Sequence, residues 1–129
     1  MKTIAIIGVG MNCDTITQEG FIAIQESEVL LGAPRLIEMF SFLKKTAFPE
    51  YMPDGVLRIL EEDSAVRYAV LLSGDVGFFS AANGLLPALK AYDVRLIPGI
   101  SCLSYFFARL KRPWQEAAII GCHGRDGNL

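Results

Sequence analysis

Short, predominantly apolar runs recur along the chain, and each stops at a turn that contains glycine. The clearest are residues 3–9 (TIAIIGV), 67–72 (RYAVLL) and 93–97 (DVRLI). The first of these runs is continuous and β-branched, which is typical of a strand buried on both faces, as in a parallel sheet. Parallel strands need crossover connections between them, and these are usually helices. We therefore expect an α/β fold with a mostly parallel sheet flanked by helices.

The segments between these runs carry helical patterns, in which apolar residues recur at helical spacings. The predicted helices cover residues 15–26, 34–42, 55–62, 80–92 and 101–110. Their expected starts are Thr17, Pro34, Asp54 and Ser101, which are residue types that favour the first positions of a helix. Pro87 marks a kink or a tighter segment within the fourth helix, and Pro113 ends the fifth.

Three shorter strands complete the predicted order. Residues 28–31 form one, residues 46–48 form an edge strand stopped by Pro49, and residues 117–122 (AAIIGC) form the last. Crossovers between parallel strands are expected to be right-handed. The last strand follows a helix stop and has little chain behind it, so we expect it to open a second unit and the chain to be a fragment.

Composition excludes several classes of protein. In 129 residues, 52% are hydrophobic, which excludes disorder over most of the chain. Twelve basic and fourteen acidic residues give a net charge of −2 without a basic stripe, which argues against nucleic-acid binding. No apolar run approaches the ~20 residues of a spanning helix, and the first residues lack a signal-peptide pattern. We expect a cytoplasmic protein without a membrane segment.

Cysteine and histidine give no sign of a metal centre. Cys13, Cys102 and Cys122 lie far apart, and only Cys122 has a histidine, His123, beside it. Neither the number nor the spacing matches a disulfide framework or a zinc site. We expect small buried thiols in a reducing compartment, and no metal.

Ligand sites of open parallel sheets lie beyond the carboxyl ends of the strands. Glycine-containing turns over residues 8–10, 74–77 and 98–101 follow three predicted strands, so we expect them to converge. The first is no dinucleotide fingerprint, because Cys13 stands where the third glycine belongs. The other interpretation of residues 8–10 is a tight turn in which a side chain would clash.

The second turn, Ser73–Ser80, leaves two interpretations open. Asp75 lies at a strand end before a helix, where its charge complements the helix dipole, or it influences a cation or hydroxyl groups in a cleft. Ser80 caps the helix or also faces a ligand. In the third turn, Pro98 and Gly99 fix the backbone and Ser101 caps the next helix.

No acid–base machinery is evident in the sequence. His123 is the single histidine, so a Ser/His/Asp arrangement is excluded. The acidic run Glu61–Asp63 is interpreted as a solvated helix end. Any chemistry is therefore expected to depend on the positioning of reactants.

Taken together, three blocks resemble the tetrapyrrole methylases, which use S-adenosylmethionine: residues 3–10, 71–80 (LLSGDVGFFS) and 97–105 (IPGISCLSY). Three further blocks are most similar to the branch that methylates carbon 5 of a precorrin or cobalt-precorrin in cobalamin biosynthesis. They are residues 30–36 (LLGAPRL), 109–114 (RLKRPW) and 122–125 (CHGR).

The resemblance implies a two-domain α/β protein that forms a homodimer, with S-adenosylmethionine in the cleft between the domains and the tetrapyrrole in an adjacent trough. Residues 1–113 would be the N-terminal domain and residues 114–129 the start of the C-terminal one. A partner subunit for a second methylation and decarboxylation is also implied. The alternatives are a uroporphyrinogen, diphthamide or ribosomal RNA substrate, or a half-domain that binds ligand without turnover.

Individual residues follow from the resemblance. The implied cofactor-binding residues, which would also hold the product S-adenosylhomocysteine, are Gly74, Asp75, Val76, Ser80, Ala81, Ser101 and Cys102. Asp75 would favour the cationic cofactor, and Val76 replaces the family's usual proline. On the substrate side the implied residues are Val9, Gly10, Arg35, Arg109, Arg112 and Arg125, the arginines because guanidinium groups pair with carboxylates. Residues 11–14 (MNCD) replace the family's Pro-Gly-Asp, and His123 and Arg125 match a His-Gly-Arg element.

Overall fold

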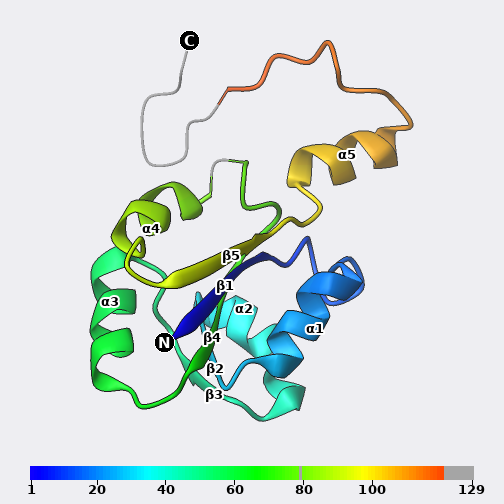
Figure 1. The fold of residues 1–129 in the computed structure, drawn as a ribbon. Helices are drawn as coiled ribbons and strands as arrows, with labels where there is room; N and C mark the ends of the chain where they lie inside the picture. The colour runs from blue at the N-terminus through cyan, green and yellow to red at the C-terminus, as the bar shows by residue number, and fades with distance from the viewer. Residues whose placement is uncertain (79, 121–129) are drawn as a thin grey trace.

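The computed structural model describes residues 1–78 and 80–120. These residues form a five-stranded sheet in the order β3-β2-β4-β1-β5 (Figure 1). All four strand pairs are parallel. The strands are β1 (Thr3–Gly8), β2 (Val29–Gly32), β3 (Thr46–Phe48), β4 (Arg67–Leu72) and β5 (Asp93–Ile97). The predicted α/β class, the central strand over residues 67–72 and the edge strand over residues 46–48 are confirmed.

Helices lie on both faces of the sheet (Figure 1). On one face are α1 (Gln18–Glu26), α2 (Pro34–Met39) and the short 3-10 helix η1 (Ser41–Leu43). On the other face are α3 (Pro53–Glu62) and α4 (Ala82–Ala88). The helix after the last strand, α5 (Cys102–Leu110), projects away from the sheet in Figure 1.

Each face of the sheet has its own apolar core, because successive strand residues point to opposite sides. In β1, Ile4 and Ile6 pack with residues of α3 and α4. Ile7 and the following Val9 pack with residues of α1 and α2. All four side chains are buried, and burying one such side chain contributes roughly 1.5–3 kcal/mol. The two cores hold the central strands rigidly and so fix the loops at their ends.

Most predicted helix starts agree with the structure. The Thr17 hydroxyl accepts a hydrogen bond from Gly20 N at 3.0 Å, and the Ser101 hydroxyl accepts one from Ser104 N at 3.1 Å. Pro34 occupies the first turn of α2 as expected. The prediction that Asp54 caps α3 is wrong, because the cap is Met52 and Pro53 begins the helix. Proline suits that first position, since its missing N–H would have no partner there.

Three helices are shorter than predicted. The helix expected over residues 15–26 begins at Gln18, directly after its cap Thr17. The helix expected over residues 34–42 ends at Met39 and continues as η1, which Lys44 closes in the left-handed region at φ 55°. The helix expected over residues 80–92 is α4, which begins at Ala82 and ends at Ala88, with Pro87 near its end. Proline has no backbone N–H to donate to the preceding turn, so it weakens the last turn of the helix and favours an early end of the helix.

The chain after β5 packs little against the rest. No residue of α5 is buried, and Lys111, at φ 59°, ends the helix before Pro113 is reached. The strand predicted over residues 117–122 is not formed across residues 117–120, and residues 121 and 122 lie outside the described part. A strand needs hydrogen-bonding neighbours, and no strand within residues 1–78 and 80–120 pairs with the exposed Ile119 and Ile120.

Within the described ranges, no helix is long and apolar enough to cross a membrane.

The amino-terminal edge of the sheet is closed by polar contacts. The Lys2 ammonium donates to Leu60 O at 2.7 Å and to the Tyr68 hydroxyl at 3.0 Å, and Tyr68 donates to Asp63 Oδ2 at 2.8 Å. The hydrogen bonds from Ala65 N and from Tyr68 lower the pKa of Asp63. This cluster ties the end of α3 to β1 and β4.

Two neighbouring leucines of α4 test the core. Leu85 is fully buried and Leu86 is 37% exposed. We expect Leu85→Ala to lower the free energy of unfolding by about 2–5 kcal/mol, because it leaves a cavity between α4 and the sheet. Leu86→Ala, the matched control, should cost less than about 1 kcal/mol. Urea unfolding measures both, and equal losses would contradict the placement of α4.

Candidate functional site

The three glycine-containing turns meet at the carboxyl edge of the sheet, as the topology predicts. Gly10 and Gly74 exchange two backbone hydrogen bonds, of 3.1 Å from Gly10 N and 2.9 Å from Gly74 N. Val9 N also donates to Leu72 O at 2.8 Å. These bonds extend the β1–β4 pairing beyond the strands and hold the two loops together.

Glycine is required here because the backbones approach too closely for a side chain. A Cβ atom on Gly99 would lie 2.3 Å from Gly8 O and 2.4 Å from Gly74 O. One on Gly8 would lie 2.6 Å from Gly74 O. Gly74 also has φ +68°, which disfavours other residues. The turns after β1, β4 and β5 therefore form one packed unit.

The Asp75 carboxylate joins two of these turns. Its Oδ1 accepts a hydrogen bond from Gly99 N at 3.0 Å, and its Oδ2 accepts one from Gly77 N at 3.3 Å. Gly77 belongs to the loop after β4, whereas Gly99 follows β5. Because α4 begins only at Ala82, the carboxylate holds the loops and does not sit on the first turn of that helix.

Ser80 organises the rest of the loop before α4. Its hydroxyl donates to Val76 O and accepts from Ala82 N at 3.2 Å. Ala81 is the N-cap residue, so Ser80 supports the helix start from one position earlier than a cap would. Both residues are half-buried and lie beyond the carboxyl end of β4. The implied cofactor residues of this loop thus form one hydrogen-bonded segment.

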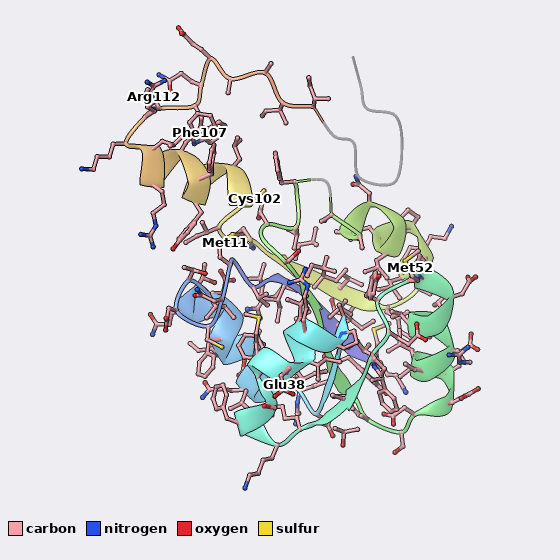
Figure 2. The ribbon with its side chains drawn as sticks, turned by 180° about the vertical axis from the view of Figure 1, so that it is seen from behind. Met11, Glu38, Met52, Cys102, Phe107 and Arg112 are labelled. Carbon is pink, nitrogen blue, oxygen red and sulfur yellow. The ribbon has the colours of Figure 1, made fainter. Side chains whose placement is uncertain are left out.

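The start of α5 lies next to the loop after β4 at the carboxyl edge of the sheet. The side chain of Ser101 is buried, while Cys102 is exposed. Figure 2 shows Cys102 and Met11 at the same end of the molecule. The prediction of buried thiols is wrong for both described cysteines, because Cys13 and Cys102 occupy a loop and a helix start and are exposed. Cys122 lies outside the described residues.

Hydrogen bonds to one side chain order the turn after β1. The Thr15 hydroxyl accepts hydrogen bonds from Met11 N at 2.8 Å and from Asn12 N at 3.0 Å. Thr15 was not predicted from the sequence, although threonine hydroxyls commonly form hydrogen bonds with backbone groups three or four residues away. Gly10 is left-handed at φ 73°, and the Val9 side chain is fully buried. Val9 therefore offers only its backbone to a ligand.

The candidate arginines lie apart. Arg35 is exposed in the first turn of α2, just beyond the carboxyl end of β2. Arg109 on α5 donates to the Tyr105 hydroxyl at 2.5 Å, and this bond raises the pKa of the Arg109 guanidinium. Arg112 follows the end of α5 and is exposed. Arg125 and His123 lie outside the described residues.

A groove of about 570 Å³ lies at the opposite, amino-terminal edge of the sheet, along the starts of β1, β4 and β5 and the end of α1. Its arginines are already engaged, since Arg95 lies 3.5 Å from the Glu19 carboxylate and Arg67 Nε donates to Glu26 O at 2.8 Å. We place the site at the carboxyl edge, because the glycine turns converge there and the strand ends open onto it.

The chemistry of the carboxyl edge favours binding. Across residues 1–78 and 80–120, no group of three or more His, Cys, Asp or Glu residues could hold a metal ion. Among the described residues, the turns after β4 and β5 offer backbone groups, small side chains and the Asp75 carboxylate. Such an arrangement can hold and orient a polar ligand.

Comparison with known proteins points to one family. The family model for tetrapyrrole (corrin/porphyrin) methylases matches residues 3–128. The chain is 29% identical over 126 residues to a probable cobalt-factor III C(17)-methyltransferase of Methanothermobacter thermautotrophicus, with 91% of this chain and 36% of that protein covered. It is 25% identical over 131 residues to a probable cobalt-precorrin-7 C(5)-methyltransferase of Methanocaldococcus jannaschii, with 97% and 62% covered.

The fold leads to the same family. The crystal structure of a precorrin-6Y methylase from Archaeoglobus fulgidus superposes with a TM-score of 0.68 at 26% identity, and covers 92% of this chain and 62% of that chain. This chain therefore spans roughly a third to three-fifths of the relatives it matches.

Two glycines test the packed unit of turns. We expect Gly99→Ala to lower the free energy of unfolding by about 1–3 kcal/mol, because its Cβ would overlap backbone oxygens of Gly8 and Gly74. On Gly84 in α4 the nearest atom to a Cβ is Pro53 Cγ at 3.6 Å, so Gly84→Ala should be neutral or stabilise by up to about 1 kcal/mol. Thermal unfolding compares them, and a tolerated Gly99→Ala would show that the turns are not closely packed.

Proposed function

Because the chain belongs to the tetrapyrrole methylase family, we propose that the carboxyl edge of its sheet binds S-adenosylmethionine for methyl transfer to a tetrapyrrole. The observation that carries this proposal is the convergence of the turns after β1, β4 and β5. These turns contain the residues that the family resemblance implies for ligand binding. The family uses S-adenosylmethionine as its methyl donor.

The residues at this edge fit such a ligand. The loop after β4 lies close to the start of α5, since a Cβ atom on Gly74 would come 3.7 Å from Ser101 Cα and 3.8 Å from Cys102 N. The small side chains of both segments suit a close approach of an adenosyl and amino-acid moiety to the backbone. The proposed cofactor-binding residues are Gly74, Asp75, Val76, Ser80, Ala81, Ser101 and Cys102. Two of them, Ser80 and Ser101, already hold their own loops and so keep the backbone in place.

For the substrate we propose a precorrin or cobalt-precorrin, methylated at ring carbon 5. Support comes from the sequence blocks at residues 30–36 and 109–114, and from the similarity to a probable C(5)-methyltransferase and to a precorrin-6Y methylase. The relative that is 29% identical carries a C(17) name, so a different tetrapyrrole carbon or substrate is the alternative.

The proposed mechanism depends on orientation. When bound, S-adenosylmethionine supplies a methyl group on a positively charged sulfur to an electron-rich ring carbon. The chain's residues would hold the two reactants in line, and well-oriented reactants can contribute roughly 7–11 kcal/mol to lowering the barrier. The close-packed turns suit this task, because a rigid backbone keeps its hydrogen-bonding groups at fixed positions.

Substrate carboxylates need cationic partners. Precorrins carry acetate and propionate groups, and guanidinium groups bind carboxylates bidentately. We propose Arg35 and Arg109 for this role, with Val9 and Gly10 lining the substrate side by their backbone. Arg112 and Arg125 stay predictions, as do the homodimer, the partner subunit, the cytoplasmic location and the domain division at residue 113.

Titration calorimetry with S-adenosylhomocysteine tests this proposal. The unmodified chain should show saturable binding. Cys102→Trp should weaken it by about tenfold or more, because a bulky ring at the exposed start of α5 would fill the proposed site. Ser64→Trp, at an exposed position before β4, should bind as the unmodified chain does. No binding to the unmodified chain, or equal binding by both variants, would contradict the proposal.

A further inference from the structure

We propose that Asp75 is a positioning residue, whose carboxylate holds the turn before α5 against the loop after β4. The inference rests on the proposed function, because these two segments form the two walls of the proposed S-adenosylmethionine site. It assigns Asp75 a role distinct from direct attraction of the cationic sulfur.

The geometry of the carboxylate supports this role. Its two oxygens accept backbone N–H groups from different segments, Gly99 at 3.0 Å and Gly77 at 3.3 Å. Hydrogen bonds to an ionised acceptor are stronger than those between neutral groups. Since Asp75 is half-buried and its bond from Gly99 N is partly buried, water competes for that bond less than at an exposed site. The side chain thus joins two backbone segments that lie 24 residues apart.

The turn before α5 has few other attachments. The β1–β5 pairing ends at Ile7 and Ile97, and no residue of α5 is buried. The turn is held by the close packing of Gly99 against Gly8 and Gly74, by the buried Ser101 and by the bond to Asp75. Without that bond, α5 would keep its fold but its start would move relative to Gly74. The distance between the two walls would then vary.

Positioning and direct charge attraction predict different ligand selectivity. S-adenosylmethionine carries a positive sulfur, and S-adenosylhomocysteine carries a neutral one. A carboxylate that acts on the sulfur charge favours the first ligand over the second. A carboxylate that acts by holding the walls supports both ligands equally, because their adenosyl and amino-acid parts are the same.

The experiment measures the Kd of both ligands for the 129-residue chain and for Asp75→Ala and Asp75→Asn. We expect Asp75→Ala to weaken both by about tenfold or more and by the same factor, since a charge-assisted hydrogen bond is lost. Asp75→Asn keeps one oxygen for Gly99 N and should recover part of the affinity. Asp93→Asn, at the start of β5, removes a charge at the opposite edge and should change neither Kd.

Amide hydrogen exchange of Gly99 is the second readout, and it needs no ligand. We expect faster exchange in Asp75→Ala than in the unmodified chain, with the amides of β1 and β4 unchanged. A much larger loss for S-adenosylmethionine than for S-adenosylhomocysteine would overturn the inference, as would unchanged exchange at Gly99. If the unmodified chain binds neither ligand, the proposed function fails, while the exchange rate at Gly99 still decides whether Asp75 holds the turn.

Discussion

The carboxyl edge of this molecule depends on the close approach of three backbone turns. Gly8, Gly74 and Gly99 follow or end three parallel strands, and a Cβ atom on Gly8 or Gly99 would overlap backbone atoms of the neighbouring turns. This contact requires the three strands to end in register, which the β1–β4 and β1–β5 pairings provide. The contact also depends on the apolar cores on both faces of the sheet. These cores hold β1 in place, and a shift of β1 would separate the turns. The cores on the two faces of the sheet therefore keep the turns of the proposed site in position.

Around this contact, polar side chains act mainly on the backbone. Thr15 orders the turn after β1, Ser80 orders the loop before α4, and Asp75 joins that loop to Gly99. Each interaction fixes main-chain groups of a turn at the carboxyl edge. Among the described residues these side chains hold the backbone, which suits a site whose contribution to a reaction would come from keeping reactants in place.

Much of the fold could be predicted from local pattern. The runs over residues 67–72 and 93–97 form strands, as expected for short, predominantly apolar segments between helical ones. Thr17 and Ser101 capped helices as their chemistry indicates. The strand over residues 117–122 was predicted from the same kind of pattern and is not formed across residues 117–120, because a strand also needs a neighbour. Local sequence does not contain that information.

The site was predictable in position but not in detail. Topology alone placed the glycine turns together, whereas the bond from Gly99 to Asp75 joins segments too distant for any local rule. The exposure of Cys13 and Cys102 was not predicted, because composition does not tell whether a cysteine lies inside a buried element or in a loop or helix start at the surface. The hydrogen bonds of Thr15 follow from its spacing from Met11 and Asn12, but threonine at such a spacing is too common to indicate them from sequence alone.

The most direct test of the central claim maps the ligand onto the fold. Amide chemical shifts of the isotopically labelled chain would be recorded during titration with S-adenosylhomocysteine. Binding at the carboxyl edge should shift the amides of Gly10, Gly74, Gly99 and Cys102 and leave those at the amino-terminal groove, such as Ala5 and Arg95, in place. Shifts centred on that groove, or no shifts at saturating ligand, would contradict the claim.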